Sequence, residues 1–312
     1  MFEIPARVQS LKIPAGRRIL AVSDIHGNLP YLRGLLEKAA FGADDERVVR
    51  YILGKKVGLL WEMCNEAGLD PFDLEDFASV KRLLRRRFAE EWDFLESLPH
   101  AIETEHCIFA HAAVRPGKPL RAHTADELTR FDAFMKQGWR FDKWVIVGHW
   151  PVVLYHRDIV CANPIVDRES RIVSIDGGCV LKDDGQLNAL IVPEEGSGDF
   201  GFVSYDPFPL RTVKTAQAAG ERSYYIRWGD SRVQVLRRGG EFSRCRHVRT
   251  GYEMDILTKY LFTGEEYTDC NDCTDYVLPL EPGDAVGVVE ETSRGYFVKH
   301  KGVSGWYFGE LI

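Results

Sequence analysis

The stretch that decides the fold runs from Arg17 to Asn28 and reads Arg-Arg-Ile-Leu-Ala-Val-Ser-Asp-Ile-His-Gly-Asn. Its apolar run, Ile19–Val22, is typical of a strand that is buried on both faces of a sheet. A polar cluster follows, and from Leu29 apolar residues recur at helical spacing, with Pro30 in the first turn, where its missing N–H costs nothing. The stretch therefore predicts a strand, a loop and a helix. In open α/β sheets, ligands bind at such junctions.

Asp24 and His26 are the side chains of this loop that can bind a metal ion. They alternate around Ile25, so in an extended segment both point to the same side. A carboxylate and an imidazole suit borderline divalent ions such as Mn, Fe, Zn or Ni better than Ca, and Gly27 lets the backbone turn sharply beside the ion. For these two residues alone, an aspartate that caps the next helix beside an uninvolved histidine is an equally good interpretation.

Two further strands are followed by histidines. The apolar runs Cys107–Ala110 and Trp144–Val147 predict short buried strands, and His111 and His149 come just after them. The repetition of one pattern favours a metal site over three independent coincidences. Because the carboxyl ends of parallel strands share one edge of a sheet, we expect both histidines to join the Asp-x-His pair around a common centre.

The other segments of this half alternate between strand and helix patterns, which indicates the α/β class. Arg171–Asp176 predicts a strand and turn, with the carboxylate of Asp176 placed to orient a ligand histidine. Leu187–Val192 predicts the hairpin partner of that strand. Val48–Ala67 and Phe72–Leu98 predict helices, because their apolar residues recur at three and four.

Length and composition narrow the classes of protein. A chain of 312 residues suggests two domains. The formal net charge of −7 and the pI of about 5.8 argue against a nucleic-acid-binding surface. The sequence contains no 18-residue apolar run and no signal pattern, so we expect no membrane contact and a cytoplasmic location. The 7 cysteines, an odd number, fit a reducing compartment better than a disulfide framework.

Together these segments resemble a calcineurin-like metallophosphoesterase, in the branch of the phosphoprotein phosphatases and bis-nucleosyl tetraphosphate hydrolases. The resemblance rests on motifs whose order and spacing are specific. They are Ser23-Asp-Ile-His-Gly-Asn28, Leu95-Glu-Ser-Leu-Pro99 leading to Ile108-Phe-Ala-His-Ala-Ala113, Gly148-His-Trp-Pro151, and Ile175-Asp-Gly-Gly-Cys-Val180 with Leu187-Asn-Ala-Leu190.

The resemblance implies an α+β sandwich of the metallophosphoesterase type, and hydrolysis of a phosphoric monoester or anhydride by metal-activated water. It implies two divalent metal ions (Mn, Fe, Zn or Ni) and a phosphate-ester substrate. The catalytic metal ligands it implies are Asp24 and His26 for one ion, and His111 and His149 for the other. Asn28 and Arg115 are candidates for substrate binding. For Arg115 a phosphate clamp and an ordinary surface arginine are equally good interpretations.

Two family motifs are missing from the sequence. No Gly-Asp or Gly-Asn dipeptide, which would mark the bridging aspartate and the Gly-Asn segment of the family, occurs between Leu29 and Val147. One explanation is that the sequence is discontinuous near Asp45, where the stretch with both motifs would belong. The alternative is a catalytically inactive phosphoesterase fold that acts as a binding module through its C-terminal region.

The C-terminal part differs in kind, and we expect three divisions: a phosphoesterase domain (1–212), a β-hairpin connector (213–245) and a small all-β domain (246–312). The last resembles a bacterial SH3-like barrel, with Gly283-Asp284 before one strand and Gly305-Trp306 at the last. Its aromatic residues Tyr296, Trp306 and Tyr307 suggest a groove for a peptide partner. Packing in the core of the domain is at least as good an interpretation.

A second group of potential metal ligands lies in the same region. Cys270 and Cys273 form a lone Cys-x-x-Cys, and Cys245 with His247 would complete the ligand count of a structural zinc site. Because the spacing is not that of a standard zinc finger, reduced and unligated thiols are the favoured interpretation.

Overall fold

The computed structural model of the chain describes residues 4–40, 63, 66–68, 77–263 and 268–312. Backbone contacts divide the chain into two compact units. The first comprises Met1–Pro151, Pro164–Val180 and Gln186–Asp206, and the second Val152–Asn163, Leu181–Gly185 and Pro207–Ile312. The predicted discontinuity near Asp45 lies outside the described residues, as does most of the helix predicted for residues 48–67.

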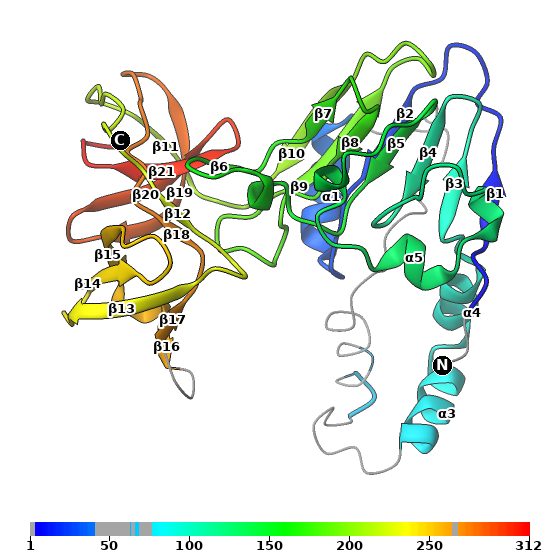
Figure 1. Cartoon of the computed structure of the whole chain (residues 1–312), viewed down its shortest axis with the longest axis horizontal. Coiled ribbons are helices and arrows are strands. Elements are labelled where there is room, and N and C mark those ends of the chain that lie inside the picture. Colours follow the sequence, from blue (N-terminus) through cyan, green and yellow to red (C-terminus); the bar gives the residue numbers. More distant parts are fainter. Residues whose placement is uncertain (1–3, 41–62, 64–65, 69–76, 264–267) are drawn as a thin grey trace. The chain divides into compact units, whose positions relative to one another are not determined.

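The first unit is built on two sheets. Figure 1 shows their strands in colours from blue through cyan to green. The six-stranded sheet has the order β1-β3-β4-β5-β8-β7, and the three-stranded sheet has the order β10-β9-β2. The strands are β1 (Val8–Ser10), β2 (Ile19–Val22), β3 (Ala101–Glu103), β4 (Cys107–Ala110), β5 (Trp144–Val147), β7 (Ile165–Asp167), β8 (Ile172–Ser174), β9 (Leu187–Val192) and β10 (Gly201–Tyr205).

The two sheets pack face to face, because alternate residues of each strand point to opposite sides. Ile19 and Ala21 of β2 share one buried cluster with Trp144 and Ile146 of β5, and this cluster fills the space between the sheets. The intervening residues face outward. Since both faces of these strands are buried, their sequences read as continuous apolar runs. The predictions of strands at 19–22, 107–110 and 144–147 are confirmed.

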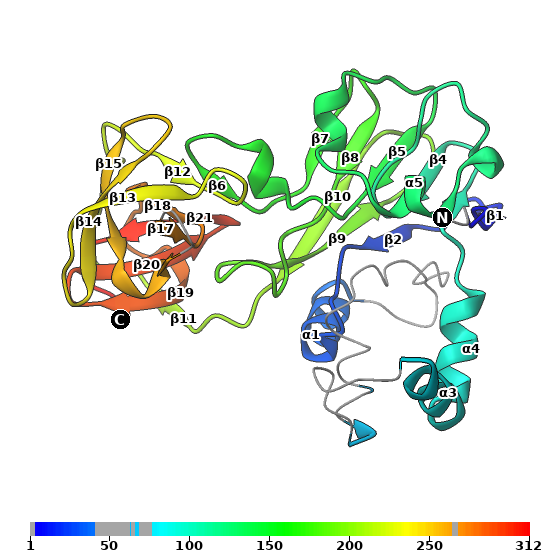
Figure 2. The same cartoon turned by 60° about the horizontal axis from the view of Figure 1, so that its bottom comes forward.

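Helices cover the outer faces of both sheets. Helix α1 (Leu29–Lys38) packs through Leu35 on the outer residues of β2 and β9. Helix α5 (Ala125–Thr129) and the short helix Phe134–Gln137 cover the other sheet through Leu128 and Phe134. Figure 2 shows α1 and α5 from a second direction. The first unit is therefore a mixed α/β sandwich.

Two more helices, α3 (Phe77–Arg87) and α4 (Ala89–Ser97), follow in the sequence range predicted to be helical. Leu84 and Phe88 form a small buried cluster there with Met63. No helix within the described ranges is both long and apolar enough to cross a membrane.

Three local predictions for the first unit are wrong. The strand Leu187–Val192 is not the hairpin partner of β8: β9 pairs antiparallel with β2 and β10, and β8 pairs with β5 and β7. The segment after β2 is not extended at His26, whose φ is 50°. The interpretation of Asp24 as a helix cap also fails, because the N-cap of α1 is Asn28, which accepts a hydrogen bond from the Tyr31 N–H at 3.1 Å.

The second unit is all-β. One sheet has the order β11-β19-β20-β21-β6 and another the order β15-β14-β13-β17-β16, while β12 pairs with β18. The strands are β6 (Val160–Cys161), β11 (Leu210–Thr212), β12 (Tyr225–Ile226), β13 (Arg232–Arg237), β14 (Phe242–His247), β15 (Glu253–Leu257), β16 (Leu261–Thr263), β17 (Thr268–Cys270), β18 (Cys273–Thr274), β19 (Ala285–Thr292), β20 (Gly295–His300) and β21 (Val303–Tyr307).

The connector predicted for residues 213–245 folds differently from a simple hairpin. A tight turn joins Arg227 to Asp230, as predicted, but β12 pairs with β18 whereas β13 pairs with β14 and β17. The predicted boundary between residues 245 and 246 falls inside β14. Tyr307, a predicted groove residue, is fully buried and its hydroxyl donates to the Thr215 carbonyl at 2.7 Å, so it belongs to the core. The SH3-like barrel stays a prediction.

Candidate active site

Asp24 lies just after the end of β2, and buried polar contacts hold the backbone in place there. The preceding residue, Ser23, is fully buried beside Asn188 of β9. The Ser23 N–H donates to the Asn188 carbonyl at 2.9 Å, and the Asn188 N–H donates to Ser23 Oγ at 3.2 Å. The carboxylate of Asp24 is consequently held at the end of β2 with only 2% of the residue exposed.

Asn188 also links the two sheets. Its side-chain amide donates to the carbonyl of Ile175, just after β8, at 3.0 Å, and its Oδ1 accepts from Gln186 Nε2 at 2.8 Å. A buried polar group needs such partners, because each missing one costs stability. Asn188 thus ties the strand ends of one sheet to those of the other, a role that its place in a motif did not reveal.

His111 and His149 come from neighbouring parallel strands. In the register of β4 and β5, Ala110 lies opposite Val147. One residue further on, the Gly148 N–H donates to the His111 carbonyl at 2.9 Å. The centroids of the two imidazole rings are therefore only 5.0 Å apart.

Asp24 reaches these histidines from the opposite sheet. The His149 N–H donates to Asp24 Oδ1 at 3.3 Å, and His111 Nε2 lies 3.9 Å from Asp24 Oδ2. A Cβ atom on Gly148 would stand 2.3 Å from Asp24 Oδ1, so only glycine leaves room for this approach. The three side chains converge where the ends of the facing sheets meet, rather than along the edge of one parallel sheet as expected from sequence.

His26 has the hydrogen-bonding pattern of a metal ligand. Its Nδ1 lies 2.8 Å from the backbone carbonyl of Cys179. Since a carbonyl can only accept, Nδ1 carries the proton, and in the neutral ring Nε2 carries the lone pair. His26 Nε2 is buried and has no hydrogen-bond partner within the described residues. A ligating histidine typically donates its other N–H to a carbonyl or carboxylate in this way.

His149 lies beside a residue that no motif indicated. Its Nε2 lies 3.3 Å from Oδ1 of Asp132, in the loop after α5. His149 and His26 also share an uncommon left-handed backbone, with φ of 65° and 50°. Residues held in such conformations cost free energy and cluster at functional sites.

The other predicted site residues have structural partners. Asn28 caps α1, and Asp176 Oδ1 accepts from the Gly178 N–H at 2.8 Å. Arg115 pairs with Glu127 at 3.3 Å, and its side chain is 49% exposed. The pKa of Glu127 is lowered to about 2, mainly by the hydrogen bond from Lys118 and further by the one from the Thr124 N–H. Arg115 therefore lies beside a carboxylate that is ionised at neutral pH.

The fit of a metal ion is mixed. Carboxylate and imidazole donors suit borderline divalent ions. In the neutral ring of His26, the lone pair is on Nε2, the nitrogen that would bind an ion. However, no group of three or more His, Cys, Asp or Glu side chains in the described part of the chain is arranged closely enough to hold an ion. The donor types fit a metal centre, whereas the donor atoms of the described residues are too far apart for three of them to bind one ion.

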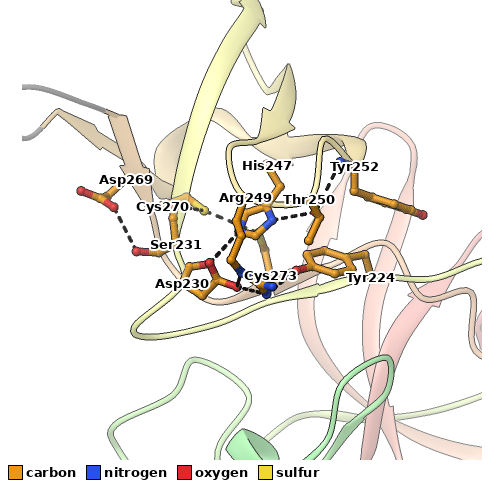
Figure 3. A network of polar contacts seen from close by, with 10 residues as sticks. All are labelled: Tyr224, Asp230, Ser231, His247, Arg249, Thr250, Tyr252, Asp269, Cys270 and Cys273. Atoms are coloured by element: carbon orange, nitrogen blue, oxygen red, sulfur yellow. Dashed lines mark hydrogen bonds and ion pairs between the residues drawn. The ribbon is translucent and has the colours of Figure 1, made fainter.

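The second group of potential ligands is partly committed elsewhere. Figure 3 shows the ring of His247 between Thr250 and Asp230. His247 Nδ1 is 2.8 Å from Thr250 Oγ1, and Nε2 is 3.0 Å from the Asp230 carbonyl. Both ring nitrogens are engaged, which removes His247 from the predicted zinc ligands. The sulfur atoms of Cys270 and Cys273 are 4.0 Å apart, and the pKa of the Cys273 thiol is raised well above its usual value by its hydrogen bond with Cys270 and by burial.

No family model matches the chain, and no curated protein matches it either. Among solved structures, the chain is similar to a crystal structure described as that of a "putative diadenosine tetraphosphatase". The two are 20% identical with a TM-score of 0.42, and the match covers 65% of this chain and 99% of that chain.

Proposed function

We propose that the protein is a metal-dependent phosphoesterase, which hydrolyses a phosphoric monoester or anhydride in a reducing, cytoplasmic compartment. In this proposal Asp24 and His26 hold one divalent ion, and His111 and His149 hold a second. One observation carries it: Asp24 reaches within 3.9 Å of His111 and accepts from the His149 N–H, although the residues come from two different sheets.

Each residue of the proposed metal site has a different role. When bound, divalent ions polarise phosphoryl oxygens and lower the pKa of a bound water to near neutrality. Asp24 supplies a buried carboxylate, an oxygen donor of the kind that borderline divalent ions bind. The Cys179 carbonyl keeps the proton of His26 on Nδ1, so Nε2 is the donor atom. Gly148 supplies the space in which the Asp24 carboxylate lies.

Arg115 and Asn28 are the proposed contacts to the substrate. Arg115 could bind a phosphate oxygen only by sharing its guanidinium with Glu127, to which it is paired at 3.3 Å. Because the side chain of Arg115 is half exposed, such an exchange costs little. Asn28 remains a candidate through its side-chain amide, since its Oδ1 is used by the helix cap.

The alternative is an inactive phosphoesterase fold that works as a binding module. The absence of a closed three-residue donor group from the described ranges favours it. Turnover of p-nitrophenyl phosphate with added Mn²⁺ discriminates between the two proposals. The enzyme proposal expects turnover that His149→Ala abolishes, while His106→Ala, which alters a half-exposed histidine of the same unit, leaves it unchanged. No turnover in the wild-type protein, at any Mn²⁺ concentration, would favour the binding module.

A further inference from the structure

We propose that Asp132 is a positioning residue that fixes the tautomer and the ring orientation of His149. The inference rests on the proposed function in one respect, the role of His149 as a metal ligand. Asp132 Oδ1 lies 3.3 Å from His149 Nε2, and the His149 side chain is 12% exposed whereas that of Asp132 is 65% exposed. An exposed carboxylate therefore faces a nearly buried imidazole.

The backbone around Asp132 is anchored even though its side chain is exposed. Phe134 is 1% exposed and packs edge to face on Trp139, with ring centroids 5.9 Å apart. The ring of Phe131 also lies beside Trp139, with ring centroids 5.5 Å apart, and the Arg115 guanidinium lies 5.9 Å from the centre of the Phe131 ring. Asp132 is thus held between two aromatic anchors, so its carboxylate is presented to His149 by a fixed loop.

The next residue contributes a further constraint. Ala133 has a φ of 52°, in the left-handed region that side chains other than glycine rarely adopt. Such a conformation costs free energy and persists only where the surrounding contacts enforce it. Here the turn lets Phe131 and Phe134 both reach Trp139, and it leaves Asp132 directed at the imidazole.

The chemistry of the contact selects one nitrogen. An ionised carboxylate only accepts hydrogen bonds, so it favours the proton on His149 Nε2 and the lone pair on Nδ1. His26 has the opposite arrangement, because the Cys179 carbonyl keeps its proton on Nδ1. The two histidines would therefore offer different nitrogen atoms to metal ions. Acceptors of this kind typically contribute about 10- to 100-fold in metal affinity.

The test begins with the metal-free protein. Nitrogen-15 NMR of labelled histidines reports which ring nitrogen carries the proton. We expect His149 to be in the Nε2–H tautomer in the wild type, to lose that preference in Asp132→Ala and to keep most of it in Asp132→Asn, whose amide oxygen still accepts. Asp126→Asn is the matched control, because Asp126 is a 66% exposed carboxylate in the same region that pairs with Arg130 and not with a histidine.

Calorimetric titration with Mn²⁺ then measures the consequence. Asp132→Ala should weaken Mn²⁺ binding by about 10- to 100-fold, and Asp126→Asn should leave it unchanged. An unchanged tautomer of His149 in Asp132→Ala would overturn the inference whatever the activity of the protein. If instead the tautomer shifts but the wild-type protein binds no Mn²⁺, the positioning by Asp132 is supported and the proposed metal function fails.

Discussion

Gly148 and Asp24 fit together so closely that a methyl group on the glycine would stand 2.3 Å from Asp24 Oδ1. Gly148 follows β5 of the six-stranded sheet, and Asp24 follows β2 of the three-stranded sheet. The absence of one side chain therefore allows the two sheets to bring their functional residues together. The backbone of the glycine is not in the left-handed region, so its role is to leave space and not to permit an unusual φ.

Gly148→Ala should consequently impair the site by steric displacement alone. The new Cβ atom must push the Asp24 carboxylate away from His111 and from the His149 N–H. We expect phosphoesterase turnover to fall by about 100-fold, which is about 2.7 kcal/mol in the activation barrier. The matched control is Gly201→Ala, where the nearest atom to a new Cβ is 3.8 Å away, an ordinary contact. Equal activity of the two variants would show that the approach of Asp24 is irrelevant to catalysis.

A second prediction concerns the link between the sheets. In Asn188→Ala the Ile175 carbonyl and the Gln186 amide each lose a buried partner. Each buried group left unsatisfied costs about 1–3 kcal/mol, so for the two groups we expect the free energy of unfolding to fall by roughly 2–6 kcal/mol. Urea denaturation followed by circular dichroism measures the change. Gln137→Ala, which removes an exposed side-chain contact at 3.4 Å, should cost less than about 0.5 kcal/mol.

A third prediction concerns acid stability. The pKa of Glu127 is lowered from 4.5 to about 2. A carboxyl with a depressed pKa contributes stability above its unfolded pKa and loses it as the pH falls toward its folded pKa. Glu127→Gln should therefore be less stable than the wild type at pH 7, and the difference should shrink from about pH 4.5 downward and vanish near pH 2. Urea midpoints across this range test it.

The control for this experiment is Glu169→Gln, which removes a mostly exposed ion pair with Arg140. Exposed pairs contribute little, so its midpoint should stay close to that of the wild type at each pH. A stability difference for Glu127→Gln that is independent of pH would show that packing, and not charge, is responsible.

The strands that carry the site could be predicted from sequence because burial on both faces gives an unmistakable pattern. Ile19–Val22 and Trp144–Val147 are uninterrupted apolar runs, and both are strands with the predicted bounds. The helix after Asn28 was equally clear, since Pro30 and the apolar spacing both indicated its start. These features depend on local sequence, and local sequence is enough to predict them.

Pairing between strands could not be predicted in the same way. An apolar run such as Leu187–Val192 carries no sign of which neighbour it will choose, and β9 pairs with β2 across a long separation in sequence. For the same reason the sequence placed all four ligand candidates on one sheet, whereas the structure brings Asp24 from a second one. The residues that orient the histidines were missed because one acts through a backbone carbonyl, at Cys179, and the other, Asp132, lies in a loop without a motif.

The last prediction decides between an enzyme and a binding module. Metal is first removed by dialysis against a chelator. Calorimetric titration with Mn²⁺ then gives the number of ions bound per chain. The enzyme proposal expects two, with turnover rising as the second binds, because a pair of ions stabilises both the attacking and the leaving oxygen. Asp24→Asn keeps the shape of the side chain but removes its charge, so it should weaken binding of both ions, since Asp24 lies 3.9 Å from His111 as well as beside His149. His111→Ala should remove only one. The inactive fold expects the wild-type protein to bind a single ion or none and to show no turnover. The reason is that donor atoms too far apart to bind one ion together hold a metal weakly.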